Sequence, residues 1–230
     1  DSNKITEVEL CELEKVAFPS AGSCGGQFTA NTMACVSEAI GLALPGSSST
    51  PAPYESRDKF AYDSGIKVMD LINMQLKPRD IVNNDTISNA FALDMAMGGS
   101  TNTVLHTLAA SIEGDLTFDM SMINEISSKT PYLCKVSPAT PNVHMEDVLN
   151  AGGISAILKE LSKKDGVLNL DRPTITGKTL GETIKPAKNL NKNITISKNK
   201  IFQRSIYAIR NIKKGCLLYT SDAADEGLGV

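Results

Sequence analysis

Most of this sequence follows the spacing of amphipathic helices, in which apolar residues recur every three or four positions. The clearest stripe consists of four apolar residues about one helical turn apart: Met33, Val36, Ile40 and Leu44. Thr29 or Asn31 can cap the start of this helix, and the Pro45–Gly46 pair stops it. We therefore predict a helix from about residue 29 to residue 44.

The same spacing predicts helices along most of the chain before residue 165, with loops rich in Pro, Gly and Ser between them. The further helical segments are residues 5–16, 54–76, 84–97 and 103–111, a helix that begins at Asp119 or Ser121, and residues 144–164 with a break at Gly152–Gly153.

The periodicity changes after about residue 171, where short segments rich in Thr, Ile, Asn and Lys replace the helical pattern. A proline-punctuated stretch at residues 130–143 is also predicted to be extended. We therefore predict an α/β domain over residues 1–180 and the start of a β-rich domain over residues 181–216. Residues 217–230 fit neither pattern, resemble translated sequencing-adaptor read-through, and are left out of the fold prediction.

Composition narrows the class of protein. Hydrophobic residues make up 41% of the chain and charged residues 21%, which is enough apolar material for a packed core. The net charge of −3 and the lack of a basic run argue against nucleic acid as a partner. No stretch approaches the roughly 20 apolar residues that span a membrane. The start lacks Met and a signal peptide, so we expect a piece of a longer, cytoplasmic protein with reduced cysteines.

Cys24 lies in an unusual setting, the bare loop Gly22-Ser23-Cys24-Gly25-Gly26 directly before a predicted helix. Flanking glycines let a backbone approach a ligand closely. A helix N-terminus favours the thiolate over the thiol, and both a nucleophile and a metal ligand need a thiolate. The residue type alone leaves three interpretations open: a nucleophile, a metal ligand, or a small buried residue.

The nucleophile interpretation pairs Cys24 with His144, as in a cysteine hydrolase. The downstream spacing is close to that of papain-like proteases. However, Gly25 stands where those enzymes have an aromatic residue, and Ala21 stands where they have another cysteine. We therefore retain the hydrolase as a remote alternative.

Two other segments carry candidate chemistry. Ser100, Thr101 and Asn102 follow two glycines, so they either cap a helix or present N–H and hydroxyl groups to an anionic ligand. His106, four residues further on, is predicted to be an interior histidine. The cluster of His144, Glu146 and Asp147 either binds a divalent cation, serves as acid and base, or simply starts a helix.

Five segments, in order and at the right approximate spacing, together resemble one enzyme family, the iron–sulfur dihydroxy-acid dehydratases, which also includes phosphogluconate and sugar-acid dehydratases. They are AGSCGGQFTANTMACVSEAIGLALPGS, KPRDI, AMGGSTNTVLH, PYLCKVSPATPNVHMEDVLNAGG and TITGKTLGETI. The resemblance covers about residues 5–190, with a weaker similarity that continues to Gly215. It implies a partial N-terminal cluster-binding α/β domain followed by the first strands of a β-barrel domain.

The resemblance implies a role for Cys24 as one of three thiolate ligands of an iron–sulfur cluster, with two or four irons. Gly25 and Gly26 would then line the cofactor site, and Ser100–Asn102 the substrate site. It also implies Mg²⁺ and a hydro-lyase reaction, in which a 2,3-dihydroxy acid such as 2,3-dihydroxy-3-methylbutanoate becomes a 2-keto acid on the route to valine and isoleucine. An open iron would act as a Lewis acid toward the departing hydroxyl.

The resemblance also indicates what this chain lacks. Two cluster cysteines and a Cys-Asp-Lys magnesium block would precede Asp1, and the serine base and a magnesium-binding glutamate would follow residue 215. We therefore expect these residues alone to be inactive, and the full-length enzyme to be a homodimer in the cytoplasm or, if a transit peptide is missing, in an organelle. A sugar-acid or phosphogluconate dehydratase and a non-catalytic binding module remain alternatives.

Overall fold

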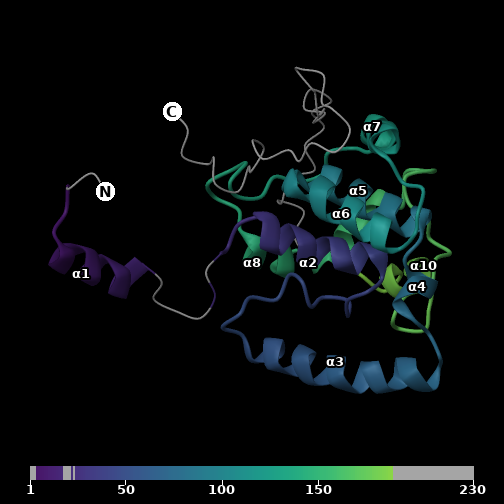
Figure 1. Ribbon diagram of the computed structural model, residues 1–230, viewed down its shortest axis with the longest axis horizontal. Helices are drawn as coiled ribbons and strands as arrows, with labels where there is room; N and C mark the ends of the chain where they lie inside the picture. Colours follow the sequence, from purple (N-terminus) through teal and green to yellow (C-terminus); the bar gives the residue numbers. More distant parts are fainter. Residues whose placement is uncertain (1–3, 18–21, 23, 189–230) are drawn as a thin grey trace.

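The computed structural model describes residues 4–17, 22 and 24–188, and its regular secondary structure is almost entirely helical (Figure 1). The described residues form ten helices: α1 (Glu7–Ala17), α2 (Thr29–Ile40), α3 (Glu55–Asn73), α4 (Pro78–Ile81), α5 (Asn84–Met97), α6 (Asn102–Glu113), α7 (Met120–Lys129), α8 (Met145–Asn150), α9 (Gly153–Leu161) and α10 (Leu180–Ile184).

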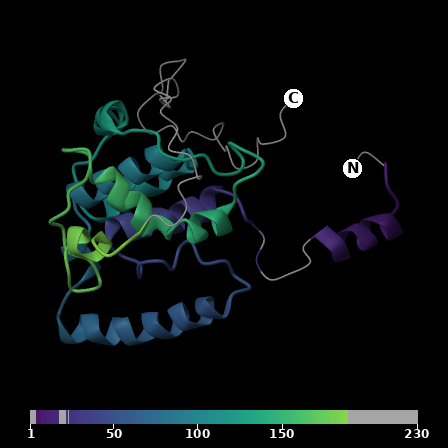
Figure 2. The same cartoon turned by 180° about the vertical axis from the view of Figure 1, so that it is seen from behind.

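Helix α5 is the centre of the molecule, and α2, α6, α7 and α9 all pack against it. Figures 1 and 2 show α3 along one edge of this group, while α1 lies well apart from it. Every residue of α1 is exposed and none of α3 is fully buried. The body that positions the loops described below is therefore the group around α5.

The sequence of α5 explains its central place. Its apolar and small residues lie on all sides of the helix, as expected for a helix buried all round. Phe91 belongs to a hydrophobic cluster with α2 and α7, whereas Leu93 and Met97 belong to a second cluster with α8, α9 and α10. The Asn83 side chain caps its start by accepting hydrogen bonds from the N–H groups of Asp85 (3.0 Å) and Thr86 (3.1 Å).

Helix α2 begins at Thr29 as predicted, but it ends before the predicted Leu44 and lacks the predicted caps. It ends at Ile40 because Gly41 adopts a left-handed φ of 94°, a conformation that favours glycine. It begins after Phe28, and neither Thr29 nor Asn31 caps it. The two polar side chains instead make longer-range hydrogen bonds, which prove important for the site.

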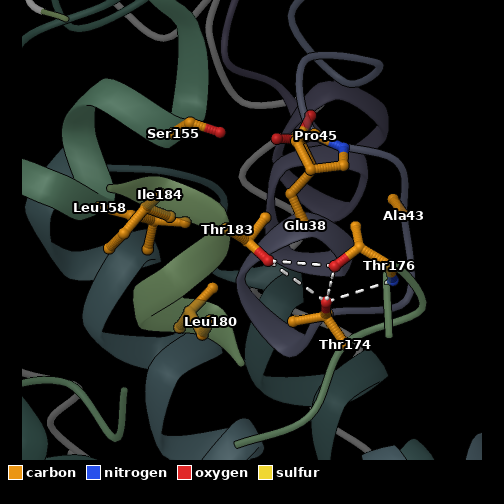
Figure 3. A pocket seen from close by; sticks show the side chains of 11 residues that line it. Glu38, Ala43, Pro45, Ser155, Leu158, Thr174, Thr176, Leu180, Thr183 and Ile184 are labelled. Carbon is orange, nitrogen blue, oxygen red and sulfur yellow. Dashed lines mark hydrogen bonds between the residues drawn. The ribbon is translucent and has the colours of Figure 1, made fainter. Parts of the chain in front are cut away.

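The prediction of β-strands is wrong for the described residues. Residues 130–143 are irregular, and the one β-bridge in the described part of the chain joins Pro173 to Thr179. In the TITGKTLGETI segment the threonine hydroxyls bond one another locally, as Thr174 does with Thr176 (2.7 Å; Figure 3). Such side-chain hydrogen bonds stabilise a turn, and they are an alternative to the backbone hydrogen bonds between paired β-strands.

The predicted β-barrel start at residues 181–216 falls mostly beyond the described residues, as does the tail at 217–230. The part that is described, residues 181–188, contains most of the short helix α10. None of the helices in the described ranges combines the length and the apolar character needed to cross a membrane.

Candidate functional site

Cys24 lies in the loop directly before α2, and its side chain is exposed. The thiol donates a long hydrogen bond to the carbonyl oxygen of Gly26, with Sγ and O 3.6 Å apart. The sulfur is therefore at the surface, on a loop whose neighbouring residues carry no bulky side chain.

The backbone around Cys24 is held by hydrogen bonds to three consecutive carbonyl groups. The Asn31 side-chain amide donates to the carbonyls of Cys24 (3.0 Å) and Gly26 (2.7 Å). The carbonyl between them, that of Gly25, accepts from the backbone N–H of Met145 (2.7 Å). Asn31, which the sequence pattern predicted only as a helix cap, therefore contributes to the site.

The segment around His144 packs against one side of this loop. The N–H of Gln27 donates to the Ser137 carbonyl at 2.5 Å. A Cβ atom built on Gly25 would lie 3.7 Å from the His144 ring, so the histidine stands beside the cysteine loop. The two segments that the sequence analysis singled out, more than a hundred residues apart in the chain, therefore meet here.

The two glycines after Cys24 differ in whether a side chain would fit at their positions. At Gly26 a side chain would lie 2.8 Å from the Phe28 ring and 2.9 Å from the Ser137 carbonyl, so only glycine fits without a shift. At Gly25 the nearest atoms are in ordinary van der Waals contact range. Gly26 therefore has a packing role, whereas a small side chain would fit at Gly25 against the His144 ring.

The loop before α6 reaches the same end of α2. The hydroxyls of Ser100 and Thr29 lie 3.0 Å apart, and the Asn102 side-chain amide donates to the Thr29 hydroxyl (2.9 Å). The backbone N–H of Ser100 donates to the Thr32 hydroxyl at 3.1 Å. Ser100 and Asn102 are buried, while Thr101 is half-buried. The predicted substrate-lining residues thus lie near the start of α2, and the side chains of Ser100 and Asn102 are bonded to it.

The other described cysteines differ sharply from Cys24. Cys35 and Cys134 are buried, and burial raises the pKa of each thiol to about 12. They stay protonated at neutral pH and are poor ligands for iron, because the thiolate is the metal-binding form. Cys11 is exposed, but it lies on α1, away from these loops.

The described residues do not form a complete metal site. No group of three or more His, Cys, Asp or Glu side chains able to hold a metal occurs in the described ranges. An exposed thiol on a small-residue loop fits a shared cluster whose other ligands come from elsewhere. Cys24 is the residue here that would hold it.

The structure brings Cys24 and His144 near each other without joining them. Among the described residues no hydrogen bond links the two side chains, and the thiol bonds to Gly26 instead. The Asp147 carboxylate accepts from the His144 backbone N–H (2.8 Å), which is a helix start rather than a cation site. His106 is exposed, so its predicted interior position was wrong: it lies on the solvent side of α6.

Two hollows lie elsewhere on the described surface. One, in Figure 3, leaves ≈ 10 Å³ between Glu38, the threonines of residues 174–183 and α9, room for about one water molecule. The other is an open basin of ≈ 400 Å³ beside Asp85, Asp115 and Arg172. Neither is lined by a residue predicted from the sequence to be in the site.

Comparison with known protein families shows which domain these loops belong to. A family model described as dihydroxy-acid/6-phosphogluconate dehydratase N-terminal matches residues 1–183. The chain belongs to this dehydratase family. The match spans the Cys24 loop, the Ser100 loop and the His144 segment, so the three meeting segments are parts of one family domain. The resemblance seen in the sequence motifs is confirmed, and with it a hydro-lyase class of enzyme.

Proposed function

We propose that this chain supplies one thiolate ligand, Cys24, to the iron–sulfur cluster of a dihydroxy-acid dehydratase. The observation that carries the proposal is the exposed thiol on a loop whose three successive carbonyls are all hydrogen-bonded. In a member of this dehydratase family, such a loop would hold the cysteine thiol in position before a cluster binds.

The chain's own residues have simple roles in this proposal. Cys24 would bind iron through its sulfur, and Gly25, beside the His144 ring, adds no side chain next to it. When bound through three thiolates, the cluster supplies a Lewis-acidic iron for the departing hydroxyl. Mg²⁺, held by residues from outside this chain, would bind the substrate carboxylate.

We propose a branched 2,3-dihydroxy acid, of the 2,3-dihydroxy-3-methylbutanoate type, as the substrate. The segments PYLCKVSPATPNVHMEDV and KPRDI support this choice over a sugar acid or 6-phosphogluconate. The product is a 2-keto acid of branched-chain amino-acid biosynthesis. We further expect the complete enzyme to be a homodimer in the cytoplasm. Light scattering on the purified protein tests the dimeric state.

Activity of the complete gene product tests the substrate. The protein is purified without oxygen and given 2,3-dihydroxy-3-methylbutanoate, 6-phosphogluconate or a sugar acid, with keto-acid formation as the readout. We expect the branched acid to react at least tenfold faster, as kcat/KM, than the other two. A preference for either sugar-derived acid would move the protein to the other branch of the family.

Reconstitution of the 230-residue chain tests what it does alone. With ferrous iron and sulfide under anaerobic conditions, we expect no stoichiometric cluster and no turnover, since the described region contains no group of three side chains able to hold a metal. Stoichiometric cluster uptake with turnover would refute the assignment of ligands outside this chain.

A further inference from the structure

We propose that Asn31 is a positioning residue that holds the Cys24 loop in its ligand-presenting shape before any cluster binds. The inference rests on the proposed function of Cys24 and deepens it. In this role, a side chain of α2 restricts a loop that would otherwise have many conformations.

The geometry around Asn31 is that of a two-point clamp. A side-chain amide carries two N–H donors, and the Asn31 amide nitrogen donates to the carbonyls of Cys24 (3.0 Å) and Gly26 (2.7 Å). Both acceptors flank Gly25, so the amide ties the chain on either side of it. Asn31 itself is half-buried in the first turn of α2.

The clamp is anchored to the rigid part of the molecule. Helix α2 packs along α5, and its Cys35 and Val36 are almost completely buried. The backbone position of a side chain in its first turn is therefore fixed. The loop, in contrast, contains three glycines in five residues, Gly22 to Gly26, and glycine loses the most conformational freedom on ordering.

The remaining bonds of the loop show what Asn31 adds. The carbonyl of Gly25 is held by Met145, and the N–H of Gln27 by Ser137, both through the backbone. These two bonds fix the side of the loop that faces residues 137–145. The carbonyls of Cys24 and Gly26 both accept from the Asn31 amide, and the Gly26 carbonyl also accepts the longer bond from the Cys24 thiol.

Residue chemistry makes the clamp specific to asparagine. Aspartate has the same shape but no donor, and its charge would face two carbonyl oxygens. Alanine removes the donors while favouring the helix, so Asn31→Ala keeps α2 intact. Ser37→Ala is the matched control, since the Ser37 hydroxyl bonds only within the same helix, to the Ala34 carbonyl.

Hydrogen exchange of the 230-residue chain measures the clamp directly. In both Asn31→Ala and Asn31→Asp we expect the amides of Gln27 and Met145 to exchange about tenfold faster, the effect of losing roughly one net hydrogen bond. The Leu93 amide in α5 and all amides of Ser37→Ala should be unchanged. Unchanged exchange at Gln27 and Met145 in both Asn31 variants would overturn the proposal.

Cluster retention in the complete, iron-loaded protein separates this inference from the proposed function. We follow the loss of cluster absorbance in the presence of an iron chelator, and expect about tenfold faster loss in Asn31→Asp and Asn31→Ala than in Ser37→Ala. If Cys24→Ala retains the cluster, the proposed function fails. If Cys24→Ala loses it while both Asn31 variants retain it as the unmodified protein does, the positioning role fails.

Discussion

At the scale of single residues, burial separates the cysteine thiols of the described residues into two kinds. Cys24 and Cys11 are exposed, whereas Cys35 and Cys134 lie in the core with thiol pKa values of about 12. A lone cysteine in a sequence gives no indication of which kind it is. The residue type left Cys24 open as a nucleophile, a metal ligand or a small buried residue, and its exposed side chain excludes the last of these.

This difference predicts a labelling pattern for the folded chain. With iodoacetamide at about pH 8, Cys24 and Cys11 should be alkylated while Cys35 and Cys134 react only after unfolding, because the thiolate is the reactive form. Peptide mass spectrometry gives the extent at each site. Native labelling of Cys35 at the rate of Cys24 would contradict the buried placement.

Glu38 provides a second residue-scale prediction. It is buried, and desolvation raises the pKa of its carboxyl above the usual 4.5, against the opposing effect of hydrogen bonds from Ser48 and Gly46. The folded state therefore holds this proton more tightly than the unfolded state. The contribution of Glu38 to stability is complete below pH 4.5 and is lost as the pH rises through its folded-state pKa.

The variant Glu38→Gln isolates this effect. It should lower the free energy of unfolding by about 1–3 kcal/mol at pH 4.5, because one acceptor of the Gly46 or Ser48 N–H becomes a donor. The deficit should shrink as the pH rises, since the glutamine does not titrate. Urea unfolding at several pH values measures it, and a deficit that grows with pH would show that the carboxylate form is the more stable one.

At the scale of elements, the helical period was a good guide and local polar chemistry was not. The pattern of apolar residues predicted α5 to the residue and the break between α8 and α9. It missed the early end of α2 at Gly41, where a left-handed glycine overrides an apolar stripe that continues to Leu44. Threonine-rich residues 174–183 read as strand because β-propensity does not record side chains that bond one another in a turn.

The contrast between α5 and α3 is itself testable. Phe91 is fully buried and stacks on Phe118 with ring centroids 5.5 Å apart, so Phe91→Ala should cost about 3–5 kcal/mol of unfolding free energy. Ile66 in α3 is 48% exposed, and Ile66→Lys should change stability by less than about 0.5 kcal/mol. Equal costs in chemical denaturation would contradict the central place of α5.

At the scale of the whole molecule, three segments far apart in the sequence meet at the start of α2. Sequence motifs identified Cys24, the Ser100 loop and the His144 segment as parts of a dehydratase, and the family match confirms that membership. The motifs did not reveal the contacts among them. Asn31 and the Met145 N–H hold the loop through backbone carbonyls, and such bonds leave no recognisable pattern in residue types.

The central claim is that the Cys24 sulfur binds the cluster, and cluster content is its most direct test. The complete gene product, its Cys24→Ala variant and its Cys11→Ala variant are purified anaerobically, and iron and acid-labile sulfide are measured per chain. We predict that Cys11→Ala keeps the full content, whereas Cys24→Ala loses most of the cluster and its dehydratase activity. Full iron, sulfide and activity in Cys24→Ala would contradict the claim.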